Sequence, residues 1–515
     1  MLNWKPPAVW RANVAVAALA LGAILFGVHG CNRQQPPPPA AAPPPAVVTP
    51  SLRPELTPLF DDLEKRTFEY FWATANPRNG LIPDRYPFTE PFSSIAAIGF
   101  GLTAYGIGVE RGYVTREKAV ERVLMTLRFL EGAPQGSRVD GMSGYHGFFY
   151  HFLDLGTGAR YGNWVELSSV DTALLLGGVL FCQSYFDQDN AGEVEIRRLA
   201  DTIYKRVEWP WMQPRSPLIA MGWMPNEGYL KYDWQGYNEG MLIYILALGS
   251  PTQGIATDSW PAWTKTYGRT WGEFQGQEFL GFAPLFGHQY SHVWIDFHGI
   301  QDAYMRERGF DYFENSRRAT YAQRAYAIAN PMAWKQYGEN VWGLTASDGP
   351  QATHQSYAGQ ERAFRHYSAR GAGQADAFDD GTIAPTAAAA SLPFAPEIVI
   401  PAVQQMHDLF GGALYAEYGF MDAFNPSFSY DVPLKTGRLI PGMGWISGDY
   451  IGIDQGPIIA MIENYRSGFV WNVMRKNPYI LRGLKRAGFT GGWLDLDTTT
   501  VGTPKKDEPV AAAAH

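Results

Sequence analysis

Two kinds of apolar pattern alternate along the chain between about residues 51 and 495. In the first kind, apolar residues recur at intervals of three and four, and charged residues fill most of the remaining positions. This spacing is typical of a helix with one buried face and one face in water. The clearest examples are 56–63, 120–130 and 194–207.

In the second kind of pattern, apolar and small residues occupy nearly every position. A helix that is apolar on all sides is expected to be buried. The clearest examples are 95–109, 170–181, 241–248 and 457–461. With weaker members included, about six amphipathic helices alternate with about six buried ones, and strand-like alternation of useful length is missing. We therefore predict an all-α toroid with an inner and an outer ring of helices.

Four long segments rich in Gly, Pro and aromatic residues interrupt the helices. They are 132–166, 210–236, 331–383 and 417–456, and each precedes a buried helix. If the chain alternates up and down, the inner helices all run in the same direction and their N-termini lie at one end of the toroid. Long loops in a folded domain are usually functional. We therefore expect the functional site at this end.

Acidic residues lie just before the buried helices or in their first turns. They are Glu166, Asp171, Glu239, Asp296, Asp449 and Asp454. Glycoside hydrolysis needs two carboxyl groups, one that donates a proton and one that activates water or attacks the sugar. A structural explanation is open for each acid. Asp171 fits a capping box with Ser168, and Glu239 suits the positive end of a helix dipole.

Composition narrows the classes of function. Aromatic residues make up 14% of the chain, which suits either a sugar-binding cleft or a large helical core. The net charge of −8 and the lack of a basic cluster argue against nucleic acid as a partner. Cys182 lies in an apolar stretch and is predicted to be a buried residue rather than a reactive thiol.

No metal or cofactor is expected. His146 and His151 match no zinc signature. The acidic run of Asp376, Asp379 and Asp380 lacks the spacing of a calcium loop, and capping of a helix start explains it better.

The N-terminus is typical of an exported lipoprotein. Positive residues precede an uncharged apolar run over 14–28, which is too short to span a bilayer and leads to a lipobox-like ending at Cys31. An uncleaved membrane anchor is the alternative. The expected location is the periplasm, at the outer membrane, with membrane contact through the lipid anchor alone. The predicted parts are a signal peptide (1–30), lipidation at Cys31, a Pro/Ala-rich tether (31–50), a catalytic domain (51–495) and a disordered tail (496–515).

Six short stretches carry a resemblance to a known family. They are TFEYFW (67–72), SSVDTALL (168–175), YNEGM (237–241), SHVWID (291–296), DDGTIAPTAA (379–388) and GIDQGP (452–457). In these stretches the chain resembles the glycoamylase-like family, glycoside hydrolase family 144. The resemblance extends over nearly the whole mature chain, and it implies an (α/α)6 barrel, in agreement with the helix pattern.

The resemblance also implies endo-acting hydrolysis of β-1,2-glucan to sophoro-oligosaccharides, with inversion of configuration. Glu239 matches the glutamate favoured as general acid. Asp454 is our candidate for the general base, and Asp171 is a third acid near the cleavage point. We expect a monomer whose partner is the glucan. The residues expected to bind the substrate are Trp164, Glu166, Trp234, Tyr237, His292, Trp294, Asp296, Trp342, Trp445 and Asp449.

Three other functions stay open on the sequence. An insertion over 351–372 at the rim of the cleft could change the sugar subsites, so an exo-acting enzyme that releases sophorose from a chain end is the first alternative. A polysaccharide lyase would need a Tyr/His base and a basic cleft. The third is a lipoprotein that binds glycans without cleaving them. The lyase candidates are Tyr145 and His146, with Arg362, Arg365, His366 and Arg370 of the insertion.

Overall fold

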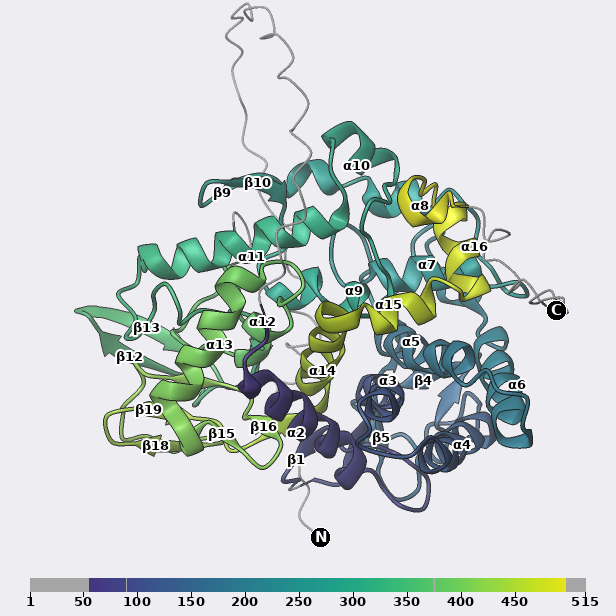
Figure 1. Ribbon diagram of the computed structural model, residues 1–515, viewed down its shortest axis with the longest axis horizontal. Coiled ribbons are helices and arrows are strands. Elements are labelled where there is room, and N and C mark those ends of the chain that lie inside the picture. Colours follow the sequence, from purple (N-terminus) through teal and green to yellow (C-terminus); the bar gives the residue numbers. More distant parts are fainter. Residues whose placement is uncertain (1–54, 89, 374–376, 497–515) are drawn as a thin grey trace, which may run out of the picture.

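The inner helices are those whose sequence is apolar on every side. The computed structural model describes residues 55–88, 90–373 and 377–496. In Figure 1, four of the inner helices (α3, α9, α12 and α14) lie towards the middle of the molecule. The four clearest predictions of a buried helix, 95–109, 170–181, 241–248 and 457–461, are confirmed, because nearly all of these residues are helical and buried. The buried helices of the described part are α3 (Ile95–Glu110), α5 (Ser169–Tyr185), α7 (Met241–Gly249), α9 (Tyr290–Trp294), α12 (Pro385–Ala389) and α14 (Gly452–Ser467).

Small residues let the inner helices approach one another closely. Helix α3 packs against both α5 and α14. A Cβ atom at Gly178 would lie 1.9 Å from the carbonyl oxygen of Gly99, and one at Gly99 would lie 2.2 Å from that of Leu174. These distances are far below van der Waals contact, so only glycine fits where α3 crosses α5. The small residues of the apolar pattern therefore serve helix packing.

Amphipathic helices lie around this group, as the sequence predicts (Figure 1). Two of them begin with a side-chain cap: Thr115 accepts a hydrogen bond from the N–H of Lys118, and Asn190 accepts one from the N–H of Glu193. The remaining helices are α2 (Pro58–Thr74), α4 (Arg116–Gly132), α6 (Ala191–Lys205), α8 (Ser259–Thr264), α10 (Ala303–Arg308), α11 (Tyr312–Ala329), α13 (Pro396–Phe410), α15 (Phe469–Met474) and α16 (Pro478–Arg486).

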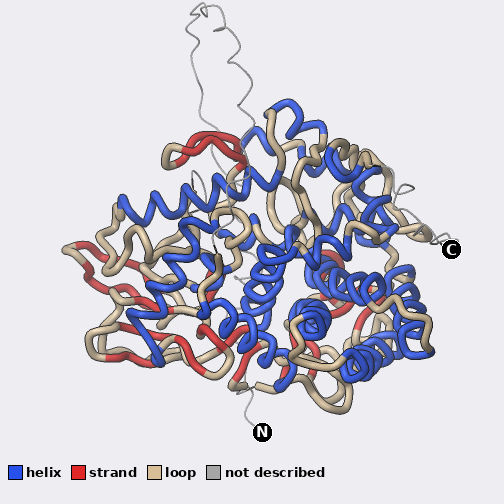
Figure 2. The backbone as a smooth tube through the Cα atoms, viewed as in Figure 1, coloured by secondary structure: helices blue, strands red, loops and turns tan. Residues whose placement is uncertain are grey.

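Strands are present as well, so the prediction of a mainly helical fold is confirmed, but the fold is not purely α-helical. The described residues form twenty strands of two to five residues, which Figure 2 shows mostly outside the helices. Such short strands have no room for a period-2 pattern, which is why the sequence did not reveal them. The largest sheet is antiparallel, with neighbours in the order β3 (Gly144–Tyr145), β4 (Phe148–Tyr150), β6 (Leu167–Ser168), β7 (Gly222–Met224) and β8 (Gly228–Tyr229).

The other strands form two- and three-stranded antiparallel pairings. β1 (Arg85–Tyr86) pairs with β20 (Tyr450–Ile451), and β2 (Phe92–Ser94) pairs with β5 (Phe152–Asp154). The predicted insertion forms a hairpin of β12 (Thr353–Tyr357) and β13 (Gln360–Phe364). The rest are β9 (Trp271–Phe274), β10 (Gln277–Leu280), β11 (Ala346–Ser347), β14 (Ser368–Ala369), β15 (Tyr415–Ala416), β16 (Gly419–Phe420), β17 (Phe424–Asn425), β18 (Arg438–Ile440) and β19 (Gly444–Ile446).

No helix in the described ranges is both long enough and apolar enough to cross a membrane. Cys182 is fully buried, as predicted. The predicted signal peptide, the Cys31 lipidation site, the tether, Asp376 and the tail from residue 497 lie outside the described residues.

Candidate active site

A cavity of about 250 Å³ lies at the N-terminal ends of the inner helices. The sixth inner helix, α12, reaches the same region, because the hydroxyl of Thr386 donates to the carbonyl oxygen of Asp454 at 2.8 Å. The prediction that these helix N-termini meet at one end is confirmed. The cavity wall includes a residue at or before the first turn of the other five: Ser94 (α3), Ser168 (α5), Glu239 (α7), Tyr290 (α9) and Ile451 (α14).

All four of the long segments reach the cavity, as predicted. The charged side chains of the wall are mostly acidic, which makes the cavity suited to a neutral or cationic ligand. The acidic ones are Asp84, Glu166, Asp171 and Glu239, and the basic ones are Arg85 and His151. The loop contributions are His151, Phe152, Trp164 and Glu166 (132–166), Met221 and Trp234 (210–236), Ala346, Tyr367, Ser368 and Ala369 (331–383), and Ile451 and Ile453 (417–456).

Glu239 has a buried carboxyl group without a hydrogen-bond partner at Oε2. The residue is 7% exposed, and its turn before α7 is fixed because Asn238 Oδ1 accepts the N–H of Gly240 at 2.9 Å. The pKa of Glu239 is raised to about 7. Burial is the main cause and the charge of Asp171 adds to it, whereas a backbone hydrogen bond acts in the opposite direction. Glu239 can therefore hold a proton near neutral pH, as a general acid must.

Asp171 lies in the first turn of α5, but Ser168 caps the helix. Ser168 Oγ accepts the N–H of Asp171 at 3.2 Å, and its hydroxyl donates to Asp171 Oδ2 at 2.5 Å. The other carboxylate oxygen, Oδ1, lies 3.5 Å from Nε2 of His151, which also lines the cavity. The capping explanation thus applies to Ser168, while the carboxylate of Asp171 faces the cavity.

His151 connects Asp171 to Glu166. Its Nδ1 lies 2.8 Å from Glu166 Oε1. Burial disfavours the charged ring, but the carboxylates of Asp171 and Glu166 raise the pKa of His151 to about 9. Among the described residues, these three have possible metal-ligand atoms within 4.8 Å of one another. The hydrogen bond from His151 to Glu166 and the ion pair with Asp171 account for the closeness of these atoms.

Asp454 lies behind the cavity wall, in the first turn of α14. It is 3% exposed and is paired with the carboxyl group of Asp422, whose Oδ2 accepts the N–H of Asp348 at 2.6 Å. Burial raises the pKa of Asp454 well above its usual range, and Asp422 adds to the increase. Asp454 itself does not line the cavity, but its charge reaches Tyr290 and Tyr367, which do.

Arg85 is an unpredicted member of the cavity wall. The pairing of β1 with β20 places it opposite Ile451. Its Nη1 lies 2.9 Å from Asp449 Oδ2 and 3.1 Å from Asp348 Oδ2, and its Nε lies 3.4 Å from Asp84 Oδ2. Asp449, which was predicted to bind the substrate, thus forms an ion pair with a residue of the cavity wall, Arg85.

Some of the missed residues had a signal in the sequence and others did not. Asp84 and Arg85 precede the inner helix α3, but at a distance of eleven and ten residues with β2 in between, so only a search of the whole segment before α3 could have found them. Asp348 and Asp422 lie far from any inner helix start in the sequence, and only the three-dimensional structure brings them to Asp454.

Six of the predicted substrate-binding residues lie in the packed interior instead of the cavity wall, which corrects the prediction. Trp294 is a clear case, since it is fully buried, stacks on Phe100 with ring centroids 5.0 Å apart, and donates to Thr103 Oγ1 at 2.9 Å. Helices that are buried on all sides direct most aromatic residues into the core. The six are Tyr237, His292, Trp294, Asp296, Trp342 and Trp445, whereas Trp164, Glu166 and Trp234 line the cavity.

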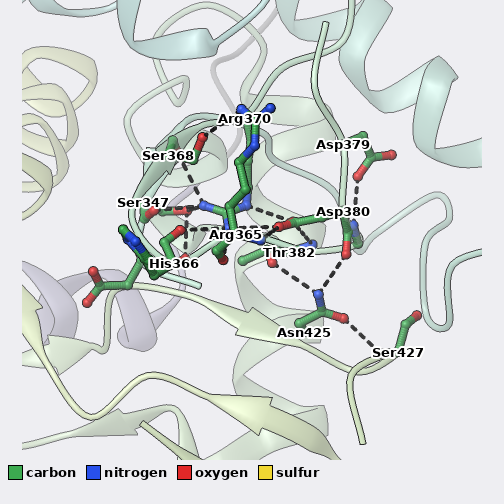
Figure 3. A network of polar contacts seen from close by, with 12 residues as sticks. Ser347, Arg365, His366, Ser368, Arg370, Asp379, Asp380, Thr382, Asn425 and Ser427 are labelled. Carbon is green, nitrogen blue, oxygen red and sulfur yellow. Dashed lines mark hydrogen bonds and ion pairs between the residues drawn. The ribbon is translucent and has the colours of Figure 1, made fainter. Parts of the chain in front are cut away.

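A buried ion pair fixes the segment that brings Tyr367 to the cavity. Arg370 and Asp380 are fully buried, with Nε 2.7 Å from Oδ1 and Nη2 2.9 Å from Oδ2. Figure 3 shows the surrounding network, in which the remaining N–H groups of Arg370 donate to main-chain carbonyl groups of its neighbours. Arg370 therefore has a structural role, which removes it as a candidate for binding a uronate.

The predicted capping role of Asp379 and Asp380 is also corrected. Asp379 accepts hydrogen bonds from Tyr326, Trp334 and Tyr337, and Asp380 is engaged by Arg370. The side-chain donors therefore explain this acidic run better than a helix start or a calcium ion.

The chain is similar to several proteins of known structure. The Glycoamylase family model, described as "Putative glucoamylase", matches residues 231–478. A protein of Bacteroides uniformis, whose crystal structure is described as that of a "putative glucoamylase", is 33% identical with a TM-score of 0.71. That match covers 84% of this chain and 97% of the other.

Two relatives have named activities. An endo-β-1,2-glucanase of Chitinophaga pinensis, solved with sophorotriose and glucose, is 30% identical with a TM-score of 0.71, and the match covers 84% of this chain and 98% of that chain. An exo β-1,2-glucooligosaccharide sophorohydrolase (non-reducing end) of Parabacteroides distasonis is 31% identical over 460 residues, 83% of this chain. The chain spans only 57% of the length of this curated relative.

Proposed function

The chain belongs to the glycoamylase-like family, glycoside hydrolase family 144, and on this basis we propose that it hydrolyses β-1,2-glucan in the cavity. The observation that carries the proposal is Glu239, a buried carboxyl group without a partner at Oε2 in a cavity lined by other acids. Glu239 donates its proton to the glycosidic oxygen as that bond breaks. A carboxylate takes a proton from the water that attacks the anomeric carbon, which inverts its configuration.

We assign the general base to Asp454, as the family resemblance implies, with Asp171 as the second candidate. A base acts as the carboxylate, and burial raises the pKa of Asp454, so hydrolysis should increase with pH as Asp454 ionises. Asp454 is paired with a second carboxyl group just behind the wall, and Asp171 lines the cavity beside the cationic His151. Asp454→Asn and Asp171→Asn should both slow hydrolysis. Added azide can replace the activated water, so it should restore turnover only in the variant that has lost the base. Rescue of Asp171→Asn alone would move the assignment to Asp171.

The acidic wall supports a neutral glucan and opposes a lyase reaction on uronates. Tyr290 and Tyr367 are the tyrosines of the wall, and burial together with the charge of Asp454 raises the pKa of each well above its usual range, which disfavours a tyrosinate base. Tyr145 and His146, the lyase candidates of the sequence, are not part of the wall.

We propose endo action. The match covers 98% of the endo-acting relative but only 57% of the exo-acting one. The β12–β13 hairpin of the insertion contributes no residue to the cavity wall, so the wall does not include the closure that an exo enzyme would need from it. An endo enzyme releases products of many lengths early in the reaction on a long glucan, whereas exclusive release of sophorose would reject endo action.

We further propose that the helices close into an (α/α)6 barrel. The alternation of inner and outer helices along the chain and the shared end of the inner helices support it. A crystal structure in which α7 or α9 lies outside the inner ring would contradict this arrangement.

The N-terminal segment supports a further proposal, that the enzyme is a monomer anchored in the periplasm through a lipid on Cys31. Cys31→Ser should move the protein from the membrane fraction of cells to the soluble fraction. Unchanged membrane association of this variant would favour an uncleaved anchor instead. Light scattering on the soluble domain tests the monomer.

Reducing-sugar release from linear β-1,2-, β-1,3- and β-1,4-glucans tests the central proposal. We expect products from the β-1,2-glucan alone. Measurable oligosaccharide binding without any product at high protein concentration would favour a glycan-binding lipoprotein. An unsaturated product that absorbs in the ultraviolet would favour a lyase.

A further inference from the structure

The ring of His151 is held in place by contacts on every side. His151 lies between β4 and β5, its N–H donates to the carbonyl oxygen of Glu166 at 3.0 Å, and its carbonyl oxygen accepts the N–H of Ile95 at 3.2 Å. The ring stacks on Phe152 with centroids 4.0 Å apart. Its position is therefore fixed by the segments that lead into α3 and α5.

Both ring nitrogens face carboxylate oxygens. Nδ1 lies 2.8 Å from Glu166 and Nε2 lies 3.5 Å from Asp171, and both acids are at least nine-tenths buried. A neutral imidazole has one nitrogen without a proton, which would turn a lone pair towards one of these oxygens. The geometry therefore favours a ring that carries both protons.

The other charged groups near His151 are also acidic. Asp84, 7% exposed, adds a third negative charge, and its own partner is Arg85. Buried carboxylates in one wall repel one another unless cations lie between them. Arg85 is the partner of Asp84, and His151 is the cation between Glu166 and Asp171.

We propose that His151 is a positioning residue of the active site, a cationic clamp that favours the carboxylate form of Asp171 and fixes the direction of Glu166 and Asp171 towards the bound sugar. This inference rests on the proposed function, because the clamp acts on carboxylates that face the substrate. The ionised Asp171 in turn favours retention of the proton on Glu239. Positive charge that develops on the sugar ring in the transition state is then stabilised by carboxylates that are already in place.

His151→Gln tests the clamp, because the amide can still donate to Glu166 but carries no charge. His146→Gln is a matched control. His146 also has a carboxylate partner, with Nδ1 2.8 Å from Glu208, and it also stacks on an aromatic ring, Trp211, but it lies outside the cavity wall.

In His151→Gln, Asp171 should take up a proton at a higher pH, because the charge of His151 lowers its pKa in the wild type. The ratio of kcat/KM between the wild type and this variant should therefore grow as the pH falls from 8 to 5, by about tenfold for each unit of pKa that the cation had lowered. The ratio for His146→Gln should stay near one throughout. A ratio that does not change with pH would overturn the clamp.

Nitrogen-15 NMR of the imidazole in the wild-type protein gives a test that needs neither activity nor a folded variant. We expect both ring nitrogens of His151 to be protonated at pH 7. A neutral ring at pH 7 would overturn the proposal, and so would loss of activity on chelation that a metal ion restores. If Glu239→Gln were fully active, the proposed acid would fail while the NMR experiment still tested the clamp.

Discussion

Helix α14 has a buried pair of carboxyl groups near each end. Asp454 pairs with Asp422 at its start, and Glu463 lies beside Glu64 near its end. All four residues are at most 3% exposed. Burial is the main reason that the pKa of Asp422 rises to about 7 and that of Glu64 to about 8, and the charges of Asp348 and Glu463, respectively, add to these increases.

The surroundings of the two pairs differ. Arg111 Nε lies 3.3 Å and Arg466 Nη2 lies 3.2 Å from Glu64 Oε2, and none of these residues lines the cavity. Within the described ranges, no arginine lies at ion-pair distance from the Asp pair; Arg85 reaches it only through Asp348. Burial of acids therefore does not by itself mark an active site. The Glu pair has arginines in contact and belongs to helix packing, whereas the Asp pair has none in contact and acts electrostatically on Tyr290 and Tyr367 of the cavity wall.

The largest effect is expected from Glu239→Gln, at the cavity end. Loss of a general acid should lower kcat by about 10²- to 10⁴-fold. The unfolding temperature should stay close to that of the wild type, because glutamine preserves the shape of the side chain. Reducing-sugar release from β-1,2-glucan measures kcat, and calorimetry measures the unfolding temperature. A variant with more than half of the wild-type rate would remove Glu239 as the acid.

Arg370→Met should lower stability, not the chemistry itself, since it leaves Asp380 as a buried charge without a partner. Breaking a buried ion pair in this way costs about 3–5 kcal/mol. Urea unfolding measures the loss, and Arg198→Met, at an exposed arginine, should change stability by less than about 0.5 kcal/mol. Equal stability of the two variants would show that the network in Figure 3 contributes little.

Asp422→Asn sharpens the difference between the two ends of α14. Asp422 helps to raise the pKa of Asp454, so its replacement by a neutral amide should lower that pKa. If Asp454 is the base, the ratio of kcat/KM in the variant to that in the wild type should rise as the pH falls from 7 to 5, by about tenfold per unit of pKa. A ratio that falls as the pH falls would show that Asp454 is not the general base.

The sequence predicted the inner helices and the place of the site, because both follow from local composition. A helix without a polar face can only be buried, and the long loops before such helices must gather where the helices begin. Glu166, Asp171 and Glu239 were found in this way. Their catalytic and binding roles stay predictions.

The strands and the residues that contact the acids could not be predicted from local sequence patterns. β1 and β20 pair residues 85–86 with 450–451, and the clamp, the Asp pair and Arg85 all depend on contacts between distant segments. Aromatic residues were the main source of error. Trp164 and Trp234 line the cavity while Trp294 is in the core, and nothing in their flanking sequence distinguishes the two situations.

The smallest effect on activity is expected from Glu64→Gln, at the arginine-rich end of α14. The folded state raises the pKa of Glu64 from 4.5 to about 8. A raised pKa contributes stability that is complete below pH 4.5 and is lost as the pH rises through about 8. Glutamine cannot ionise, so the variant should match the wild type at low pH and become more stable than it at pH 9, by up to about 5 kcal/mol at about 1.4 kcal/mol for each unit of the pKa difference. Urea unfolding at both pH values measures this crossover, while kcat should not change. A loss of activity comparable to that of Glu239→Gln would show that the acid pair at the end of α14 contributes to catalysis, although arginines contact it.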